Sequence, residues 1–304
     1  MASLGALALM YLHSTGGSIL VTAMAQSEDE GFVREDKEES GEEALYELSP
    51  QEEEGEDHPP EDLPPEDLPP EEETPPPFRG TLVFVIDDAG YSLFDLEPFL
   101  QFPGPLTIAV LPGRRDSAEA ARRIRDAGKE LLLHQPMEAL ARPPEPGAIL
   151  AGMDPEEIIA IISRNLEEIG PVAGMNNHEG SRATQDEEGM KTILALCQER
   201  GLFFLDSRTV AESVAPRLAR ELGLTIGVRD IFIDNIQTRE SMLGFINSGL
   251  VRAEATGSAI MIGHVWSPAL APLLTEIYPE LIRLGFTFST LADLLGEQDE
   301  SPGY

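Results

Sequence analysis

From Thr81 onward, short apolar runs alternate with amphipathic helical patterns, and this alternation restricts the possible folds most strongly. Near-continuous apolar runs are typical of strands that are buried on both faces, as in parallel sheets. Repeated strand-then-helix units therefore predict an α/β domain with a mostly parallel sheet, either open or closed into a (β/α) barrel. The candidate strands are Leu82–Ile86, Leu106–Leu111, Leu131–Leu133, Val172–Met175, Leu202–Leu205, Thr225–Val228 or Ile231–Ile233, Ala259–Ile262 and Phe286–Phe288.

The helical patterns between these runs have recognisable ends. Asp116 to Glu119 resembles a capping box, and Asp154 precedes a proline at a first helical position. Seven or eight strands within roughly 220 residues favour closure into a barrel over an open sheet. The expected helix boundaries are Asp116 and Gly128, Asp154 at a start, Asp186 and Gly201, and Ser267 and Gly285.

A region ahead of this domain carries most of the charge. The chain has a formal net charge of −34, and residues 27–78 hold 22 acidic and 2 basic residues. Residues 50–77 contain ten prolines and a tandem Glu-Asp-Leu-Pro-Pro unit. Such a segment buries too little apolar area to offset its ordering entropy. We predict that 27–78 is a disordered, acidic, Pro-rich linker or tether, or alternatively an acidic interaction tail, ahead of a folded domain at 79–304.

The charge balance and the cysteine count exclude several classes of protein. Nucleic-acid binders need clustered Lys and Arg, and anionic lipid surfaces attract basic segments, so neither partner is expected. One cysteine, Cys197, excludes an internal disulfide framework and a cysteine-based zinc or iron–sulfur site. Any metal must therefore be held by histidines and carboxylates.

Residues 1–26 have no charged side chain. The apolar run Leu4–Leu12 and the small-x-small pattern Ala23-Met24-Ala25 resemble a secretory signal peptide, with an uncleaved N-terminal anchor as the alternative. The stretch is too interrupted for a good membrane span, so no integral membrane domain is expected. The domain is therefore expected outside the cytoplasm, either periplasmic or secreted.

Polar side chains follow nearly every predicted strand. Three of the five histidines stand at such positions, and the carboxyl ends of parallel strands are where ligands bind. The spacing therefore predicts one shared site rather than unrelated core histidines. The residues concerned are Asp87, Asp88, His134, Glu138, Asn176, Asn177, His178, Asp206, Arg208, Asp234, Asn235 and His264.

These residue types suit metal-assisted hydrolysis. A carboxylate and two histidines form a common Zn²⁺ site with open positions. Adjacent Asp87 and Asp88 are expected to point in different directions, so that one ligates the metal and the other serves as a base toward water. A histidine on the opposite side can protonate the leaving group.

Five motifs in this order resemble the divergent polysaccharide deacetylase family 2, a branch of the NodB-like carbohydrate esterases. The resemblance runs from about residue 80 to 296. It implies a deformed (β/α) barrel with a divalent metal, expected to be Zn²⁺, at its C-terminal face. The class removes N- or O-acetyl groups from glycans. The motifs are Ile86–Tyr91, Leu133–Glu138, Gly174–Arg182, Phe204–Thr209 and Ala259–His264.

The resemblance also implies roles for single residues. Asp87 matches the catalytic base, and Asp88 and His134 match metal ligands. The class has a second histidine four residues after the first, where this chain has Glu138. The third ligand is therefore either His178 or Glu138, and Glu138 is alternatively a residue that orients a ligand.

Other roles concern catalysis and the substrate. His264 matches the general acid, and Asp206 is expected either to orient it or to cap a strand end. Arg182 orients Asp87, binds a substrate carboxylate or forms a surface ion pair. Candidate substrate-binding residues are Asn177, Asp234 and Trp266.

The sequence thus predicts a metal-dependent carbohydrate esterase that deacetylates an extracytoplasmic polysaccharide or peptidoglycan-type glycan. The missing histidine at Glu138 motivates an alternative, a non-catalytic glycan-binding pseudoenzyme of the cell envelope. A third possibility is an envelope interaction protein that acts through its acidic linker.

Overall fold

The computed structural model of the chain describes residues 8–15, 18–25 and 75–300. Within 75–300, nine strands form one sheet in which every pairing is parallel, in the order β8-β7-β6-β5-β4-β3-β10-β9, with β11 also paired to β3. The strands are β3 (Gly80–Ala89), β4 (Thr107–Val110), β5 (Glu130–Met137), β6 (Gly174–Glu179), β7 (Phe203–Asp206), β8 (Gly227–Val228), β9 (Ile231–Phe232), β10 (Ser258–His264) and β11 (Phe286–Ser289).

The two edges of the sheet are joined by consecutive residues. Arg229 donates its backbone N–H to Asp206 of β7, and Asp230 donates its own to Ile260 of β10. The sheet is therefore curled into a deformed barrel, as predicted. The sequence left Thr225–Val228 and Ile231–Ile233 as alternatives, but a strand lies in each, which raises the expected seven or eight strands to nine.

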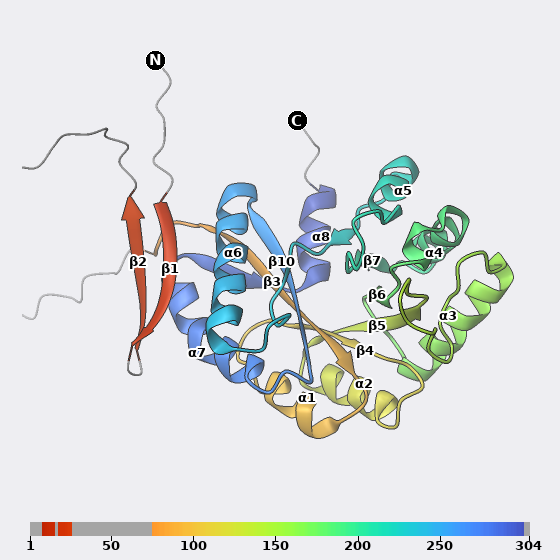
Figure 1. The fold of residues 1–304 in the computed structure, drawn as a ribbon, viewed down its shortest axis with the longest axis horizontal. Coiled ribbons are helices and arrows are strands. Elements are labelled where there is room, and N and C mark those ends of the chain that lie inside the picture. The colour runs from red at the N-terminus through yellow and green to blue at the C-terminus, as the bar shows by residue number, and fades with distance from the viewer. Residues whose placement is uncertain (1–7, 16–17, 26–74, 301–304) are drawn as a thin grey trace, which may run out of the picture.

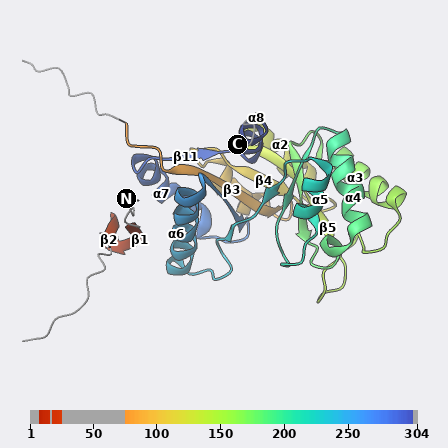
Figure 2. The same ribbon diagram turned by 90° about the horizontal axis from the view of Figure 1, so that it is seen from above.

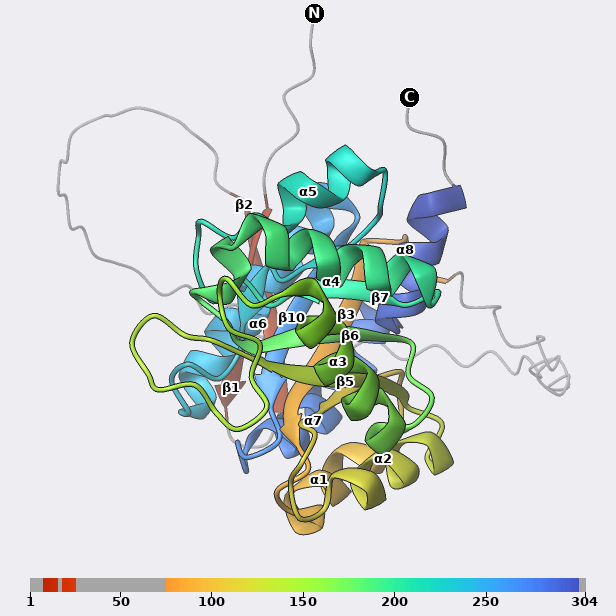
Figure 3. The ribbon, with the colours of Figure 1, turned by 90° about the vertical axis from the view of Figure 1, so that its right-hand side faces the viewer.

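Helices surround the barrel, and Figure 3 shows α1 to α5 following one another around β4 to β7. Figure 1 shows α6 and α7 beside β3 and β10. The predicted helix positions are confirmed, but the capping box is not, because Asp116 makes no side-chain cap hydrogen bond. The helices are α1 (Leu93–Leu100), α2 (Ser117–Asp126), α3 (Pro155–Ile169), α4 (Glu187–Glu199), α5 (Ala215–Leu222), α6 (Arg239–Thr256), α7 (Leu270–Arg283) and α8 (Leu291–Glu300).

The core has two parts, because side chains alternate between the faces of a strand. Leu82, Phe84 and Ile86 of β3 belong to the larger cluster, which packs against the helices. Val83 and Val85 face the barrel interior, together with leucines of α8. Helix α8 therefore closes one end of the barrel with apolar side chains, and polar side chains are left for the other end.

The start of α8 depends on Glu130. Its carboxylate accepts hydrogen bonds from the Thr107 hydroxyl (2.8 Å) and from the backbone N–H groups of Leu291 (3.0 Å) and Ala292 (3.1 Å). We expect Glu130→Ala to lower the free energy of unfolding by about 1–3 kcal/mol, because these donors lose their acceptor. Urea denaturation measures the change. The exposed Glu199, replaced in the same way, is the control and should change stability by less than about 0.5 kcal/mol.

Two further strands, β1 (Ala8–Thr15) and β2 (Ser18–Ala25), form an antiparallel pair. Figures 1 and 2 place them beside α6, away from α1 to α5. Residues 26–74, which include most of the predicted linker, lie outside the described part, so that prediction stays open. None of the described helices has both the length and the apolar character that a membrane crossing requires.

Candidate active site

At the polar end of the barrel, the side chains that face the interior follow the same every-second-residue pattern as the apolar side chains below them. Asp87 follows Val83 and Val85 at intervals of two, and His264 follows Ile260 and Ile262. Asp87 and His264 are paired in register between β3 and β10, and His134 and Asn176 are paired between β5 and β6. A layer of polar side chains therefore lies directly above the aliphatic layer.

A bulge in β3 brings both adjacent aspartates into this layer. The register between β3 and β4 shifts between Ile86 and Ala89, and Asp88 has a φ of 67°, a left-handed conformation that is rare outside glycine. Asp87 Oδ2 lies 3.7 Å and Asp88 Oδ1 3.2 Å from His134 Nε2. The expectation that the two carboxylates point in different directions is wrong, because the bulge turns Asp88 back toward Asp87.

Left-handed backbone recurs at the ends of neighbouring strands. Glu179, at the end of β6, has a φ of 54°, and Arg208, after β7, has a φ of 47°. Strained residues of this kind persist where the surrounding structure fixes them, and they are concentrated at functional sites.

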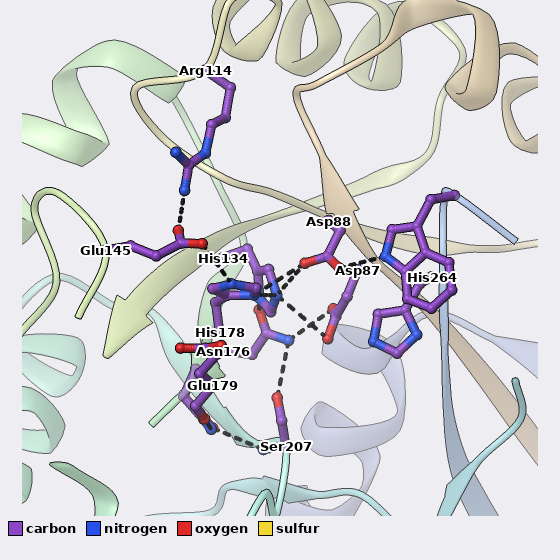
Figure 4. A network of polar contacts seen from close by, with 12 residues as sticks. Asp87, Asp88, Arg114, His134, Glu145, Asn176, His178, Glu179, Ser207 and His264 are labelled. Carbon is purple, nitrogen blue, oxygen red and sulfur yellow. Dashed lines mark hydrogen bonds and ion pairs between the residues drawn. The ribbon is translucent and has the colours of Figure 1, made fainter. Parts of the chain in front are cut away.

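Three side chains converge on one point, shown in Figure 4. Asp88 Oδ1 lies 3.2 Å from His134 Nε2 and 3.0 Å from His178 Nδ1, and the two nitrogens are 3.1 Å apart. Atoms bound to one ion at about 2.0–2.2 Å lie roughly 3.0–3.5 Å from one another. Asp88 Oδ1 is buried and has no hydrogen bond of acceptable geometry. The donor set and its spacing therefore fit a divalent metal such as Zn²⁺.

Neighbouring groups fix the direction of two of these ligands. Asn176 Oδ1 lies 2.7 Å from His134 Nδ1, so the ring donates from Nδ1 and Nε2 is the atom left to bind a metal. Trp266 Nε1 donates to Asp88 Oδ2 at 2.7 Å, which leaves Oδ1 for the shared point.

A carboxylate, Glu145, lies beside the other ring nitrogen of His178. Glu145 Oε1 lies 3.7 Å from His178 Nε2, and Glu145 is itself held by an ion pair with Arg114.

The charges of the site depend on one another. Burial disfavours the ionised form of Asp88, but His134 and His178 hold its pKa well below the usual range. Burial also disfavours the charged form of His134, but Asp87 and Asp88 raise its pKa to about 9. Burial raises the pKa of Asp87, although the charges of His134 and His264 act in the opposite direction. The negative charge of the two aspartates thus favours a positive charge beside them. Without a metal this charge is the proton on His134, and a metal ion can replace that proton.

Asp87 stays outside the three-donor set. Asn176 Nδ2 donates to Asp87 Oδ1 at 2.9 Å, and the same Nδ2 also lies 3.2 Å from Ser207 Oγ. The amide of Asn176 thus connects the metal-ligand candidate His134, through Oδ1, to the candidate base Asp87, through Nδ2. The sequence predicts Asn176 only as a polar residue at a strand end, with no role of its own. The period of two was a signal for its role, since Asn176 shares a face of β6 with His178.

His264 is held by Asp234. Asp234 Oδ1 lies 2.8 Å from His264 Nδ1, and Oδ2 accepts the backbone N–H of His264 at 2.8 Å. The prediction that Asp206 orients His264 is wrong, because Asp206 accepts the N–H of Arg208 after β7, while Asp234 follows β9, which is paired with β10. Asp206 therefore has the alternative role that the sequence allowed, at a strand end.

Aromatic rings flank His264. Trp266 stacks on it with ring centroids 4.7 Å apart, and Phe232 stacks at 5.8 Å. Trp266 is 44% exposed, so part of its ring remains available to a ligand at the mouth of the site.

Glu138 and Arg182 lie outside the donor set. Their side chains form an ion pair at 3.3 Å, and Glu138 Oε2 accepts the N–H of Ala151. Positions four apart along a strand are separated by about 13 Å, so Glu138 does not meet His134 at a metal. Arg182 does not orient Asp87 and has the surface ion pair that was the third alternative.

Asn177 borders the site, but its amide binds backbone. Its Nδ2 donates to the carbonyl of Glu179, and its Oδ1 accepts the N–H of Ser207. It therefore fixes the loops around the site. Each end of the amide keeps a second hydrogen-bonding position, so the predicted contact with substrate stays a prediction. Glu145, Ser207 and Phe232 were not predicted, since no pattern marks Glu145 in its long loop.

These side chains surround a pocket of about 450 Å³, within the range of small-ligand sites. Its lining comes from the ends of β3, β5, β6, β7, β9 and β10 and the loops that follow them. The polar lining residues are Asp87, Asp88, His134, Arg142, Asn177, His178, Glu179, Ser181, Ser207, Thr209 and His264.

The pair of Asp234 and His264 gives a testable prediction. Burial lowers the pKa of His264, but the hydrogen bond and charge of Asp234 raise it above the ordinary value. Asp234→Asn should therefore lower the pKa of His264, because the imidazolium loses its partner charge. NMR titration of the His264 ring measures this directly. An unchanged pKa would show that Asp234 does not act on the protonation of His264.

Comparison with known proteins gives consistent matches. Residues 84–295 match the model of a family described as divergent polysaccharide deacetylase. The uncharacterized protein YibQ of Escherichia coli K12 is 31% identical over 67% of this chain and 64% of its own length. An uncharacterized protein of Haemophilus influenzae is 32% identical over 68% of this chain and 75% of its own. The crystal structure of an uncharacterized Agrobacterium tumefaciens protein has the same fold, with a TM-score of 0.67, 21% identity, and coverage of 71% and 89%.

Proposed function

Because the chain belongs to the divergent polysaccharide deacetylase family, we propose that it is a metal-dependent carbohydrate esterase that removes acetyl groups from a glycan outside the cytoplasm. The observation that carries the proposal is the grouping of a three-donor metal site with a separate buried carboxylate and a histidine held by an aspartate. Metal-assisted hydrolysis uses these parts together. The location outside the cytoplasm rests on residues 1–26 alone.

Asp88, His134 and His178 would hold the ion. A bound divalent ion supplies Lewis-acid polarisation of the acetyl carbonyl and lowers the pKa of a nearby water. Asp87 accepts the proton of the attacking water, through Oδ2, because Asn176 occupies Oδ1. The C–N or C–O bond of the acetyl group breaks, and acetate leaves.

His264 donates the proton that the departing amine or alkoxide needs. Its Nδ1 is bound to Asp234, so Nε2 is the atom available for this transfer. Figure 4 shows His264 on the other side of Asp87 from the two histidines of the donor set. The candidate base therefore lies between the donor set and the candidate acid, on strands that are neighbours in the sheet.

A non-catalytic glycan-binding protein was the alternative, motivated by Glu138 in place of a second histidine. His178 supplies a third donor from β6, at 3.0 Å from Asp88. Because the donor set needs no ligand from Glu138, the catalytic proposal is favoured.

Acetate release tests the proposal. The full chain, loaded with Zn²⁺ or Co²⁺, is incubated with N-acetylated and O-acetylated polysaccharides, and acetate is measured by an enzymatic assay. We expect release from one substrate class, loss of release in EDTA and recovery with added metal. Binding of the glycan with no acetate released under either metal would favour the non-catalytic alternative.

A further inference from the structure

A second cavity lies beside the active site and is not used by the proposed reaction. It has a volume of about 320 Å³ and lies between α5 and the ends of β7 and β8. Ser207 and Thr209 line the active-site pocket, whereas the intervening Arg208, with Asp206, lines this cavity. The two cavities therefore share the residues that follow β7 but lie on different sides of them.

Three arginines line the second cavity, and the guanidinium groups of two of them form no hydrogen bond or ion pair. Among the described residues, the guanidinium groups of Arg164, Arg208 and Arg220 have no hydrogen bond or ion pair. Two of these three, Arg208 and Arg220, line this cavity. In a chain with a formal net charge of −34, acidic side chains that could pair with arginine are abundant. Two arginines without such a pair in one cavity therefore suggest that the cavity binds an anion. A third lining arginine, Arg217, is bound by Glu187 and Glu221.

A buried carboxylate faces the same cavity. Asp206 is fully buried, and its Oδ1 accepts the N–H of Arg208 at 2.8 Å. Its Oδ2 has no hydrogen bond of acceptable geometry, and the group that faces the carboxylate from the cavity lining is the Ser213 hydroxyl. Leaving a buried polar atom unpaired is costly. An ionised carboxylate accepts hydrogen bonds only, so a ligand group that contacts Oδ2 beside Ser213 has to be a hydroxyl or N–H donor.

We propose that this cavity binds an acidic sugar, that is, a saccharide that carries a carboxylate or a phosphate group. Arg208 and Arg220 bind the anionic group, since the guanidinium fork matches the geometry of both anions. A sugar hydroxyl donates to Asp206 Oδ2. The choice of a sugar as the carrier of the anion rests on the proposed function, while the anion and the donor rest on the cavity alone.

Calorimetric titration of the full chain without metal tests the proposal. The probes are glucuronate, glucose 6-phosphate, glucose and inorganic phosphate. We expect at least one acidic sugar to bind roughly tenfold or more tightly than glucose, because each charged hydrogen bond contributes that much. The double variant Arg208→Gln, Arg220→Gln should lose this difference. The matched control is Arg164→Gln, which removes the third free arginine from α3 and should bind as the unchanged protein does.

Asp206→Asn tests the second contact. It should weaken binding of the acidic sugar more than binding of inorganic phosphate, which has no sugar hydroxyl to lose. Thermal denaturation checks that the Asp206→Asn variant is folded. If it is not folded, the arginine variants still test the proposal, because Arg208 and Arg220 have exposed side chains whose replacement should not unfold the protein.

Several results would overturn the proposal. They are the absence of binding for both acidic sugars, binding that the double arginine variant retains, and equal binding of inorganic phosphate and acidic sugars. Because the titrations need no metal and no turnover, a failure of the deacetylase proposal leaves their outcome unaffected. An acidic sugar that still binds to an Asp88→Ala variant would separate the two sites.

Discussion

Asp88→Ala is expected to lose at least about 100-fold in affinity for Zn²⁺, since even the loss of a group that only orients a ligand costs about 10–100-fold. Asp88 contributes the only carboxylate of the donor set, and its Oδ1 lies within 3.2 Å of both histidine nitrogens. Equilibrium dialysis followed by elemental mass spectrometry measures the bound metal. With Co²⁺, the absorption spectrum reports the geometry of the ligands independently of any activity.

His178→Ala should have the same effect without removing a fully buried group, since His178 is only partly buried. Asp126→Ala is the matched control, because Asp126 is an exposed aspartate whose side chain pairs with Arg122 on its own helix α2 and does not line the pocket. If the unchanged protein binds no metal in excess Zn²⁺, or if Asp88→Ala binds it as well, the three-donor site is wrong and so is the metal-dependent mechanism.

The sheet was predictable because its strands are apolar on both faces. The runs around Val85, Leu132 and Ile262 mark buried parallel strands without any long-range information. The short strands β8 and β9 were ambiguous for a physical reason. Each has two residues, and their pairing depends on closure of the sheet, which local sequence does not specify.

The position of the site was also predictable, since polar residues directly after parallel strands share one end of the barrel. The partner of His264 was not. Asp206 and Asp234 both follow strands, and only the order of the strands, with β9 beside β10, selects Asp234. Glu138 misled for a related reason. Glu138 was a candidate because it stands where the resembling class has its second histidine, but β5 is extended through Met137, which carries the side chain four positions on away from His134.

The bulge at Asp87 and Asp88 shows where local reasoning fails. Alternation along an undistorted strand sends adjacent side chains to opposite faces. The left-handed backbone of Asp88 overrides this rule and puts both carboxylates within 3.7 Å of the same histidine nitrogen. The sequence Asp-Asp-Ala-Gly carries no signal that would place a bulge there. The division of labour between the two aspartates therefore depends on strain that the fold maintains.

The separation of the base Asp87 from the ligand Asp88 also predicts a large effect on turnover. Asp87→Asn should lower kcat by about 10²–10⁴-fold, the usual contribution of general acid–base catalysis, while the metal content stays the same. Asparagine preserves the shape of the side chain and can still accept the hydrogen bond from Asn176, but it cannot take a proton from water. Acetate release gives kcat and KM, and metal analysis of the same preparation gives the occupancy.

Asn176→Ala separates the base from the group that positions it. Asn176 contacts both Asp87 and His134, so its loss should lower metal affinity as well as kcat, whereas Asp87→Asn should lower kcat alone. Full activity of Asp87→Asn would mean that another group accepts the proton of water. Parallel loss of metal and activity in Asp87→Asn would instead make Asp87 a ligand. The geometry argues against that result, because Asp87 Oδ2 lies 3.7 Å from His134 Nε2, farther than the 3.0–3.2 Å that separate the three donors.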